Sequence, residues 1–270
     1  MLINGVAGDR VSIHDRGLLY GDGIFRTMRL LGGQVLHWPR HYRKLQQDCT
    51  ALSIACPEAA LLSDELQRLS QQQPDGVAKI IITRGTQEKR GYAPAANSIP
   101  THILSLTPAP NFPASFSSHG IKLRLCDLRL GHQPRLAGIK HLNRLENVLA
   151  AAEWNDTDIA EGVLLDIAAN VIEGTRSNLF MVRGGVLQTP DLSLCGVAGV
   201  QRERVIEWAV KHGVPCQVRQ FALAELLGAD EIFLVNSIIG LWPVRELQSR
   251  SWSQFPIAMQ VQKWLNHESD

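Results

Sequence analysis

The spacing of hydrophobic and polar residues over the first hundred positions changes between a strand pattern and a helix pattern. Runs rich in apolar and β-branched residues predict strands, at 34–36, 78–83 and 101–106. Apolar residues that recur at helical spacing predict helices, at about 41–52 and 59–72. Strands interleaved with helices indicate an α/β domain in this part of the chain.

The same mixture of patterns returns after residue 120. Strands are predicted at 121–125, 162–166, 179–182, 186–189 and 231–235. One helix is predicted at about 200–212, and another has an apolar face made of Leu142, Leu145, Leu149 and Ala152. Both halves mix strands and helices, so we expect an α/β (α+β) protein of two domains.

A change in composition separates the two halves. Residues 107–120 are rich in proline and serine and interrupt the patterned sequence. We therefore predict an N-terminal α/β domain at 1–106, a linker at 107–120 and a C-terminal α/β domain at 121–270 that contains Lys140.

The composition is typical of an ordinary globular protein. The chain has 270 residues, of which 45% are hydrophobic and 20% charged, and these values exclude disorder as the main state. The formal net charge of +1 creates no global field for nucleic acid or anionic lipid. The chain has neither a secretory pattern at its start nor an apolar run long enough to cross a bilayer. We expect a cytoplasmic protein without nucleic-acid or membrane partners.

Cysteine and histidine spacing predicts no metal site. The five cysteines are widely spaced and form no CxxC pair, which argues against a disulfide framework and a structural zinc site. His37 and His41 are four residues apart, but Pro39 lies between them and breaks the helix that a zinc pair would require.

Lys140 is the first residue with candidate chemistry, because it lies in the largely apolar segment 136–142. A desolvated lysine has a depressed pKa and can form a Schiff base. A lysine at the end of an element also commonly extends its ammonium group to solvent. The segment alone leaves both roles open.

A downstream pattern favours the catalytic role. Its members lie in residues 170–202 and are Glu173, Thr175, Asn178, Phe180, Leu187, Thr189, Gly199, Val200 and Arg202. This pattern resembles the signature of the class-IV pyridoxal-phosphate enzymes. That group includes D-amino-acid aminotransferases, branched-chain aminotransferases and 4-amino-4-deoxychorismate lyases. The resemblance implies the two-domain fold type IV architecture of the D-amino-acid aminotransferases, with the cofactor between the domains.

The resemblance also implies roles for residues around the cofactor, pyridoxal 5'-phosphate. Lys140 would hold it as a Schiff base, and Glu173 would keep its ring nitrogen protonated. The main chain of Gly199, Val200 and Gln201 would bind the phosphate at a helix N-terminus. Further cofactor contacts are expected from Asn178, Ser237 and Lys44. Lys44 stands where the family places an arginine, and a lysine binds phosphate without the bidentate fork.

The N-terminal half carries the family's substrate motifs. Residues 20–27 resemble the opening motif, in which the Phe25 and Thr27 positions border the substrate pocket. Arg84 with Gly85, and the run of Arg90, Gly91 and Tyr92, resemble a second pocket loop. The resemblance therefore predicts substrate contacts for Phe25, Arg90 and Tyr92.

Arg144 distinguishes between two branches of the family. Aminotransferases usually carry a tyrosine near this position, whereas segment 138–146 resembles the lyases. The expected function is therefore a lyase that converts aminodeoxychorismate to 4-aminobenzoate and pyruvate, with Lys140 as base and Thr27 assisting departure of the leaving group. An aminotransferase and a noncatalytic binding protein remain alternatives. The resemblance also implies a homodimer, because a partner loop helps to close the cleft in relatives.

Overall fold

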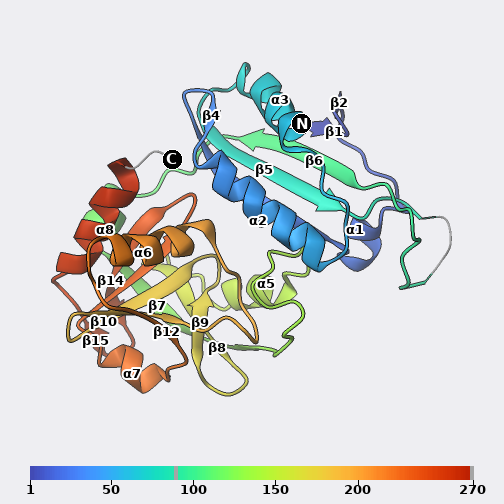
Figure 1. Cartoon of the computed structure of the whole chain (residues 1–270). Helices are drawn as coiled ribbons and strands as arrows, with labels where there is room; N and C mark the ends of the chain where they lie inside the picture. The colour runs from blue at the N-terminus through green and yellow to red at the C-terminus, as the bar shows by residue number, and fades with distance from the viewer. Residues whose placement is uncertain (88–90, 268–270) are drawn as a thin grey trace. The chain divides into compact units, whose positions relative to one another are not determined.

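The computed structural model describes residues 1–87 and 91–267 of the chain (Figure 1). Internal contacts divide the chain into two compact units. The first unit contains Met1–Asn111 and Ile139–Asn143, and the second contains Phe112–Gly138 and Arg144–Asp270. None of the helices in the described part of the chain combines the length and hydropathy of a membrane span.

The first unit is built on a six-stranded sheet with the order β2-β1-β6-β5-β3-β4. Its strands are β1 (Leu2–Ile3), β2 (Val6–Ala7), β3 (Gly23–Leu31), β4 (Gln34–Val35), β5 (Gly76–Thr83) and β6 (Thr101–Thr107). Each neighbouring pair is antiparallel. Its helices are α1 (Arg16–Tyr20), α2 (Trp38–Ala51) and α3 (Ala59–Ser70). Helix α2 packs against β3 and α3 packs against β6 (Figure 1).

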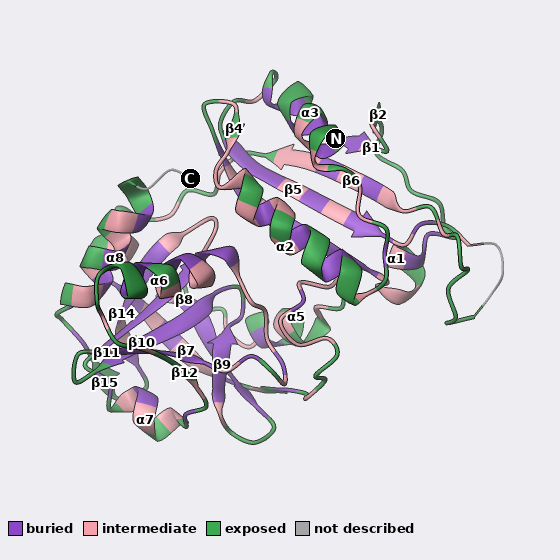
Figure 2. Cartoon of the chain, in the orientation of Figure 1, coloured by how far each residue is buried: buried purple, intermediate pink, exposed green. Residues whose placement is uncertain are grey.

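Alternation along β3 decides which side chains face the core of this unit. Ile24, Arg26, Met28 and Leu30 are buried, whereas the residues that alternate with them, Phe25, Thr27 and Arg29, are only partly buried, as a period of two requires. Along α2, buried, intermediate and exposed residues recur with the turns of the helix (Figure 2). Leu45 and Cys49 are the apolar residues on the buried face of this helix, and they join Ile24 and Met28 in one hydrophobic cluster.

The second unit is built on a nine-stranded sheet. The path β12-β11-β10-β13-β14-β7-β8-β9 gives the order of eight strands, and β15 pairs with β14. The strands are β7 (Ile121–Leu130), β8 (Ile159–Asp166), β9 (Val171–Gly174), β10 (Asn178–Arg183), β11 (Val186–Pro190), β12 (Cys216–Arg219), β13 (Glu231–Asn236), β14 (Gly240–Leu247) and β15 (Arg250–Ser251). The helices are α4 (Ala114–Ser118), α5 (Leu145–Ala151), α6 (Val200–Lys211), α7 (Leu223–Leu227) and α8 (Pro256–His267).

Large apolar side chains from the sheet and its helices form the core of the second unit. The rings of Phe180 on β10 and Phe233 on β13 stack with centroids 5.2 Å apart, because the two residues are paired across the strands. Trp208 on α6 and Val261 on α8 are buried in the same cluster. This core holds β10 and α6 together, and both elements carry predicted cofactor residues.

The structure confirms the strands predicted from periodicity, with some changes at their ends. For example, the predicted 78–83 lies within β5, and the predicted 121–125 extends to Leu130 as β7. The predicted helix face that includes Leu142 is wrong. Leu142 donates its N–H to the carbonyl oxygen of Gly23 and so lies outside α5, and Leu145 and Leu149 are exposed.

The position of Lys140 also differs from the expectation that it belongs with the part of the chain after the linker. The structure groups Ile139–Asn143 with the first unit, because main-chain hydrogen bonds join this segment to β3. The boundaries at residues 106 and 121 stay a prediction.

Candidate active site

Segment Ile139–Asn143 pairs with the start of β3 through main-chain hydrogen bonds. The N–H of Phe25 donates to the carbonyl oxygen of Lys140 at 3.0 Å, and the N–H of Leu142 donates to Gly23 at 2.9 Å. Ile24 and His141 form an antiparallel bridge between these two bonds. The main chain around Lys140 is therefore held by the first strand of the predicted substrate motif.

Phe25 lies beneath the ammonium group of Lys140. The Lys140 Nζ atom is 4.5 Å from the centroid of the Phe25 ring, and the Nζ atom of Lys79 on β5 is 5.2 Å from the same centroid. Both distances are within the range of a cation–π interaction. Thr27 lies two residues beyond Phe25 on the same, partly exposed face of β3. Sequence reasoning missed Lys79, whose position opposite Thr27 depends on the register of β3 and β5.

A buried ion pair lies behind this strand face. Arg26 on β3 donates from Nη2 to Asp48 Oδ2 on α2, and both side chains are almost fully buried. The same Asp48 oxygen accepts the main-chain N–H of Lys140 at 3.1 Å. Burial lowers the pKa of Arg26, and the charge and hydrogen bond of Asp48 act in the opposite direction. Sequence reasoning missed this pair, because no local pattern links the three residues.

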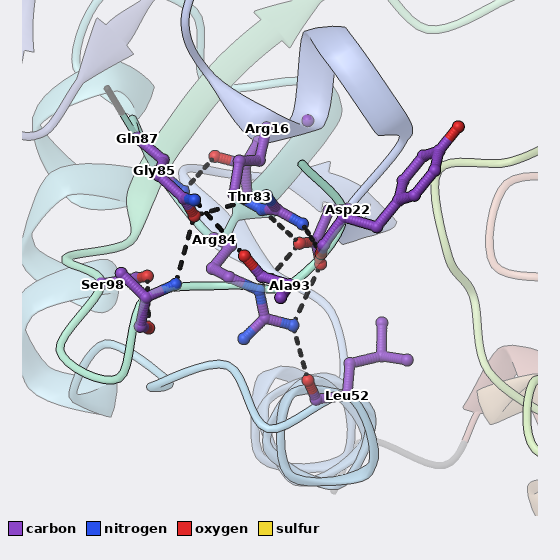
Figure 3. A network of polar contacts seen from close by, with 12 residues as sticks. Arg16, Asp22, Leu52, Thr83, Arg84, Gly85, Gln87, Ala93 and Ser98 are labelled. Carbon is purple, nitrogen blue, oxygen red and sulfur yellow. Dashed lines mark hydrogen bonds and ion pairs between the residues drawn. The ribbon is translucent and has the colours of Figure 1, made fainter. Parts of the chain in front are cut away.

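Asp22 is the centre of a second charged network (Figure 3). It accepts from Arg16 Nε at 2.8 Å and from Arg84 Nε at 2.7 Å. Burial alone would raise the pKa of the Asp22 carboxyl, but hydrogen bonds and charges from Arg84 and Arg16 outweigh burial and hold that pKa below its usual value. Arg84 also donates to the carbonyl oxygens of Leu52 and Ser53, at the end of α2.

Arg16 connects this network to the predicted second pocket loop. Its guanidinium donates to the carbonyl oxygens of Gly91 at 3.0 Å and Tyr92 at 2.6 Å. The ring centroids of Tyr20 and Tyr92 are 5.4 Å apart. Tyr92 is 85% exposed, so its predicted substrate contact stays a prediction. The predicted Arg90 lies outside the described residues.

Glu173 is a buried carboxylate of the second unit. It lies on β9, and its Oε2 atom accepts the main-chain N–H of Val197 at 2.9 Å and the Asn178 amide at 3.5 Å. The Asn178 amide also donates to the carbonyl oxygen of Val197, and its Oδ1 atom accepts the N–H of Gly199. Glu173 and Asn178 therefore hold the loop that leads into α6.

Helix α6 begins at Gly199 with no side-chain cap among the described residues. The main-chain N–H groups of the first turn, at Val200 and Gln201, belong to the positive end of the helix dipole. A Cβ atom at Gly199 would lie 2.4 Å from Asn178 Oδ1, so only glycine fits there without displacing the asparagine. Because Gly199 has no side chain, an anion can approach the main-chain N–H groups of the first turn of α6 closely.

Glu161 supports the turn that follows Glu173. It is 1% exposed, and its Oε1 atom accepts both the N–H and the hydroxyl of Thr175. Its Oε2 atom accepts the hydroxyl of Ser177 at 3.1 Å. Sequence reasoning missed this residue, because a glutamate in the middle of an apolar strand has no motif of its own.

The remaining predicted residues are Lys44 within α2, Ser237 after β13 and Arg144 before α5. Lys44 is on α2 in the first unit, and its carbonyl oxygen accepts from Arg26 at 3.3 Å. In the second unit, Ser237 follows β13, and the Asn236 side chain accepts the N–H groups of the next turn. Arg144 precedes α5 and donates to Asn147 at 3.4 Å. Their contacts to cofactor and substrate stay predictions.

Three potential metal ligands also meet in the second unit. The ligand atoms of His132, Asp166 and Cys195 lie within 4.8 Å of one another. Asp166 already accepts from His132 and from the N–H groups of Ala168 and Asn170. Burial raises the pKa of the Cys195 thiol to about 12, which disfavours the thiolate that a metal needs. The hydrogen bonds are sufficient to explain this cluster as support for a turn.

Comparisons with known proteins find relatives over almost the whole chain. The model of the amino-transferase class IV family matches residues 23–247. Aminodeoxychorismate lyase from Vibrio harveyi is 38% identical over 94% of each chain. The crystal structure of 4-amino-4-deoxychorismate lyase from Pseudomonas aeruginosa is 44% identical, with a TM-score of 0.95 over 99% of this chain and 98% of that one.

A more distant structure shows the fold alone. A hypothetical aminotransferase from Mycobacterium tuberculosis in its PLP-bound form is 21% identical, with a TM-score of 0.82 over 96% of this chain and 93% of that one. The α/β class predicted from sequence is confirmed, as is the resemblance found in residues 170–202. With a family match across most of its length and relatives of this identity, the chain belongs to the amino-transferase class IV family.

Proposed function

We propose that the chain is a pyridoxal 5'-phosphate-dependent lyase that converts 4-amino-4-deoxychorismate to 4-aminobenzoate and pyruvate. The observation that carries this proposal is the 44% identity to the Pseudomonas aeruginosa lyase over 99% of the chain. The Vibrio harveyi lyase is 38% identical over 94% of the chain, whereas a putative branched-chain-amino-acid aminotransferase from Methanocaldococcus jannaschii is 31% identical over 89% of it. The lyase reaction is therefore favoured over amino-group transfer.

The residues of the second unit fit the cofactor. The phosphate needs several N–H donors, and the first turn of α6 offers them where no described side chain caps the helix. The ring nitrogen needs a carboxylate, and Glu173 is buried with its Oε2 atom held by the Val197 N–H. A buried carboxylate can keep a nearby nitrogen protonated, because an opposite charge favours the charged form of its neighbour.

Lys140 supplies the amine. It would hold the cofactor covalently, and the aromatic ring of Phe25 beside its Nζ atom provides an apolar surface. Lys44, Asn178 and Ser237 complete the proposed cofactor contacts. When bound, pyridoxal 5'-phosphate withdraws electrons from the carbon that carries the substrate's amino group.

In the reaction, the Lys140 amine, freed once the substrate's amino group has taken its place, would be the base that takes the proton from C4 of the substrate. The electron pair of that C–H bond enters the six-membered ring, the ring becomes aromatic, and the bond to the enolpyruvyl oxygen breaks. Thr27 donates a hydrogen bond to the departing oxygen, and the released enol gains a proton on carbon to become pyruvate. The two products contain all atoms of the substrate, so no further reactant is needed.

Substrate recognition is assigned to residues of the motifs that resemble the family's substrate pocket. Phe25, Tyr92 and Arg90 contact the substrate from the N-terminal motifs, and Arg144 replaces the aromatic hydroxyl expected of an aminotransferase. Arginine is suited to pair with a carboxylate in a site that excludes water.

The family resemblance also supports a proposal for the assembly and location. The enzyme is a homodimer in the cytoplasm, and the exposed apolar residues Leu145, Val148 and Leu149 on α5 support a protein interface. Twofold symmetric dimers are the commonest arrangement of soluble oligomers.

Two assays test the function. The protein is incubated with pyridoxal 5'-phosphate, reduced with borohydride and digested, and we expect the phosphopyridoxyl group on Lys140. Lys140→Ala should lose both the label and the activity, whereas Lys122→Ala, at a partly exposed ion pair on β7, should keep both. Aminodeoxychorismate should yield 4-aminobenzoate and pyruvate in equal amounts.

Three results would contradict the proposal. A label on another lysine would remove Lys140 from its role. Efficient transfer of nitrogen from an amino acid to a keto acid, without formation of 4-aminobenzoate, would identify an aminotransferase instead. Absence of any covalent label would favour the noncatalytic binding protein.

A further inference from the structure

We propose that the buried pair of Arg26 and Asp48 is a positioning device for Lys140. The inference rests on the proposed function, in which Lys140 carries the reacting amine. Asp48 does not touch the substrate in this proposal. It acts through the main chain of Lys140, and Arg26 acts through Asp48.

The first step of the argument is the main chain of Lys140. Its carbonyl oxygen accepts from the Phe25 N–H at 3.0 Å, and its own N–H donates to Asp48 Oδ2 at 3.1 Å. Both main-chain polar groups of Lys140 therefore have defined partners. The second partner is a side chain, so the position of the Lys140 backbone depends on residue 48 as well as on the strand.

The second step is the charge of Asp48. This carboxylate is 3% exposed, and an isolated carboxylate at such depth would be costly to ionise. Arg26, also 3% exposed, donates to the same oxygen that accepts from Lys140. One oxygen atom of Asp48 therefore accepts from both the Arg26 guanidinium and the Lys140 N–H, so the two hydrogen bonds depend on each other.

The third step is rigidity. The three residues come from β3, α2 and segment Ile139–Asn143, and Arg26 is bound to α2 a second time through the Lys44 carbonyl oxygen. A single oxygen atom thus connects three segments that are far apart in sequence. An error of about 1 Å in the position of a reacting group can cost on the order of 100-fold in rate, so this connection has a catalytic consequence.

The first unit offers a matched control. Glu65 on α3 and His102 on β6 form another buried pair, with His102 Nε2 3.0 Å from Glu65 Oε1. This pair joins elements other than those that hold Lys140. Glu65→Gln therefore perturbs a buried carboxylate in the same unit without altering the Lys140 peptide.

The test compares Asp48→Ala, Asp48→Asn and Glu65→Gln with the unchanged protein. Without cofactor, amide hydrogen exchange at Lys140 should become faster in Asp48→Ala only, because Asn keeps an acceptor oxygen. With cofactor, Asp48→Ala should show slower borohydride-trapped labelling of Lys140. Its kcat should fall about 10- to 100-fold with little change in KM, and Asp48→Asn should recover part of that loss.

The outcomes separate this inference from the proposed function. If the unchanged protein is not labelled at Lys140, the proposed function fails, whatever the exchange experiment reports. If labelling succeeds but Asp48→Ala and Glu65→Gln show equal kcat and equal exchange at Lys140, the positioning role is refuted. Should Asp48→Ala not fold, Arg26→Gln and Asp48→Asn supply the same comparison, and unchanged labelling and kcat in both would overturn the inference.

Discussion

Asp22→Asn is the substitution whose consequence the structure defines most sharply. Asp22 accepts from Arg16 through Oδ2, and from Arg84 through both carboxylate oxygens (Figure 3). An asparagine offers one acceptor oxygen, and its amide group would face a guanidinium that can only donate. The substitution thus removes both the charge and at least one hydrogen bond while keeping the side-chain volume.

The burial of the three charged side chains determines how much stability the substitution removes. The side chains of Arg16, Asp22 and Arg84 are 5%, 16% and 12% exposed. Exposed ion pairs contribute about 0–1 kcal/mol, whereas removal of one partner from a buried pair costs about 3–5 kcal/mol. For a pair between these limits, we expect the free energy of unfolding at pH 7 to fall by about 2–4 kcal/mol.

The pH dependence of this loss has a defined sign. The pKa of Asp22 in the folded protein lies below the ordinary value of 3.8. Its contribution is therefore fully present above pH 3.8 and is lost as the pH falls through the folded pKa. The difference in stability between the protein and Asp22→Asn should be largest near neutral pH and should shrink in acid.

Urea unfolding, measured from neutral pH into the acid range, tests both points. Asp9→Asn is the matched control, because Asp9 pairs with Arg10 in a fully solvated position and should have no measurable effect. A difference between the protein and Asp22→Asn that stays constant across this range would refute the electrostatic reasoning. In parallel, KM should rise in Asp22→Asn, because Arg16 also holds the main chain of Gly91 and Tyr92.

Four further predictions follow from the site. Glu173→Gln should bind the cofactor but lower kcat, measured in steady-state assays, because a neutral amide does not hold the pyridinium proton. Gly199→Ala should weaken cofactor affinity in a fluorescence titration, since its Cβ would displace Asn178. Lys79→Met should raise KM more than it lowers kcat, because this cation shares the Phe25 ring with Lys140 and can attract a substrate carboxylate. Sedimentation should show a dimer at assay concentration. Normal turnover in Glu173→Gln or normal cofactor affinity in Gly199→Ala would contradict the first two predictions. An unchanged KM in Lys79→Met or a fully active monomer would contradict the other two.

Local periodicity and one motif were enough to predict much of the fold and the family. β5 is readable because a run of apolar, mostly β-branched residues makes its pattern distinctive. The chemistry around Glu173 and Asn178 is readable because both residues, and the loop they hold, lie within a short stretch of sequence. Such features depend on neighbours along the chain, and the sequence lists those neighbours directly.

Contacts between distant segments needed the tertiary structure. Leu142 fits a helical apolar face by its spacing, yet its N–H pairs with Gly23 in a strand that lies far away in sequence. The same reason applies to Asp48, which is 92 residues from Lys140 and 22 residues from Arg26. A sequence determines by itself which residues can donate, accept or be buried. Which donor meets which acceptor depends on packing, because a buried polar group must find its partner among whatever segments the fold brings within about 3 Å.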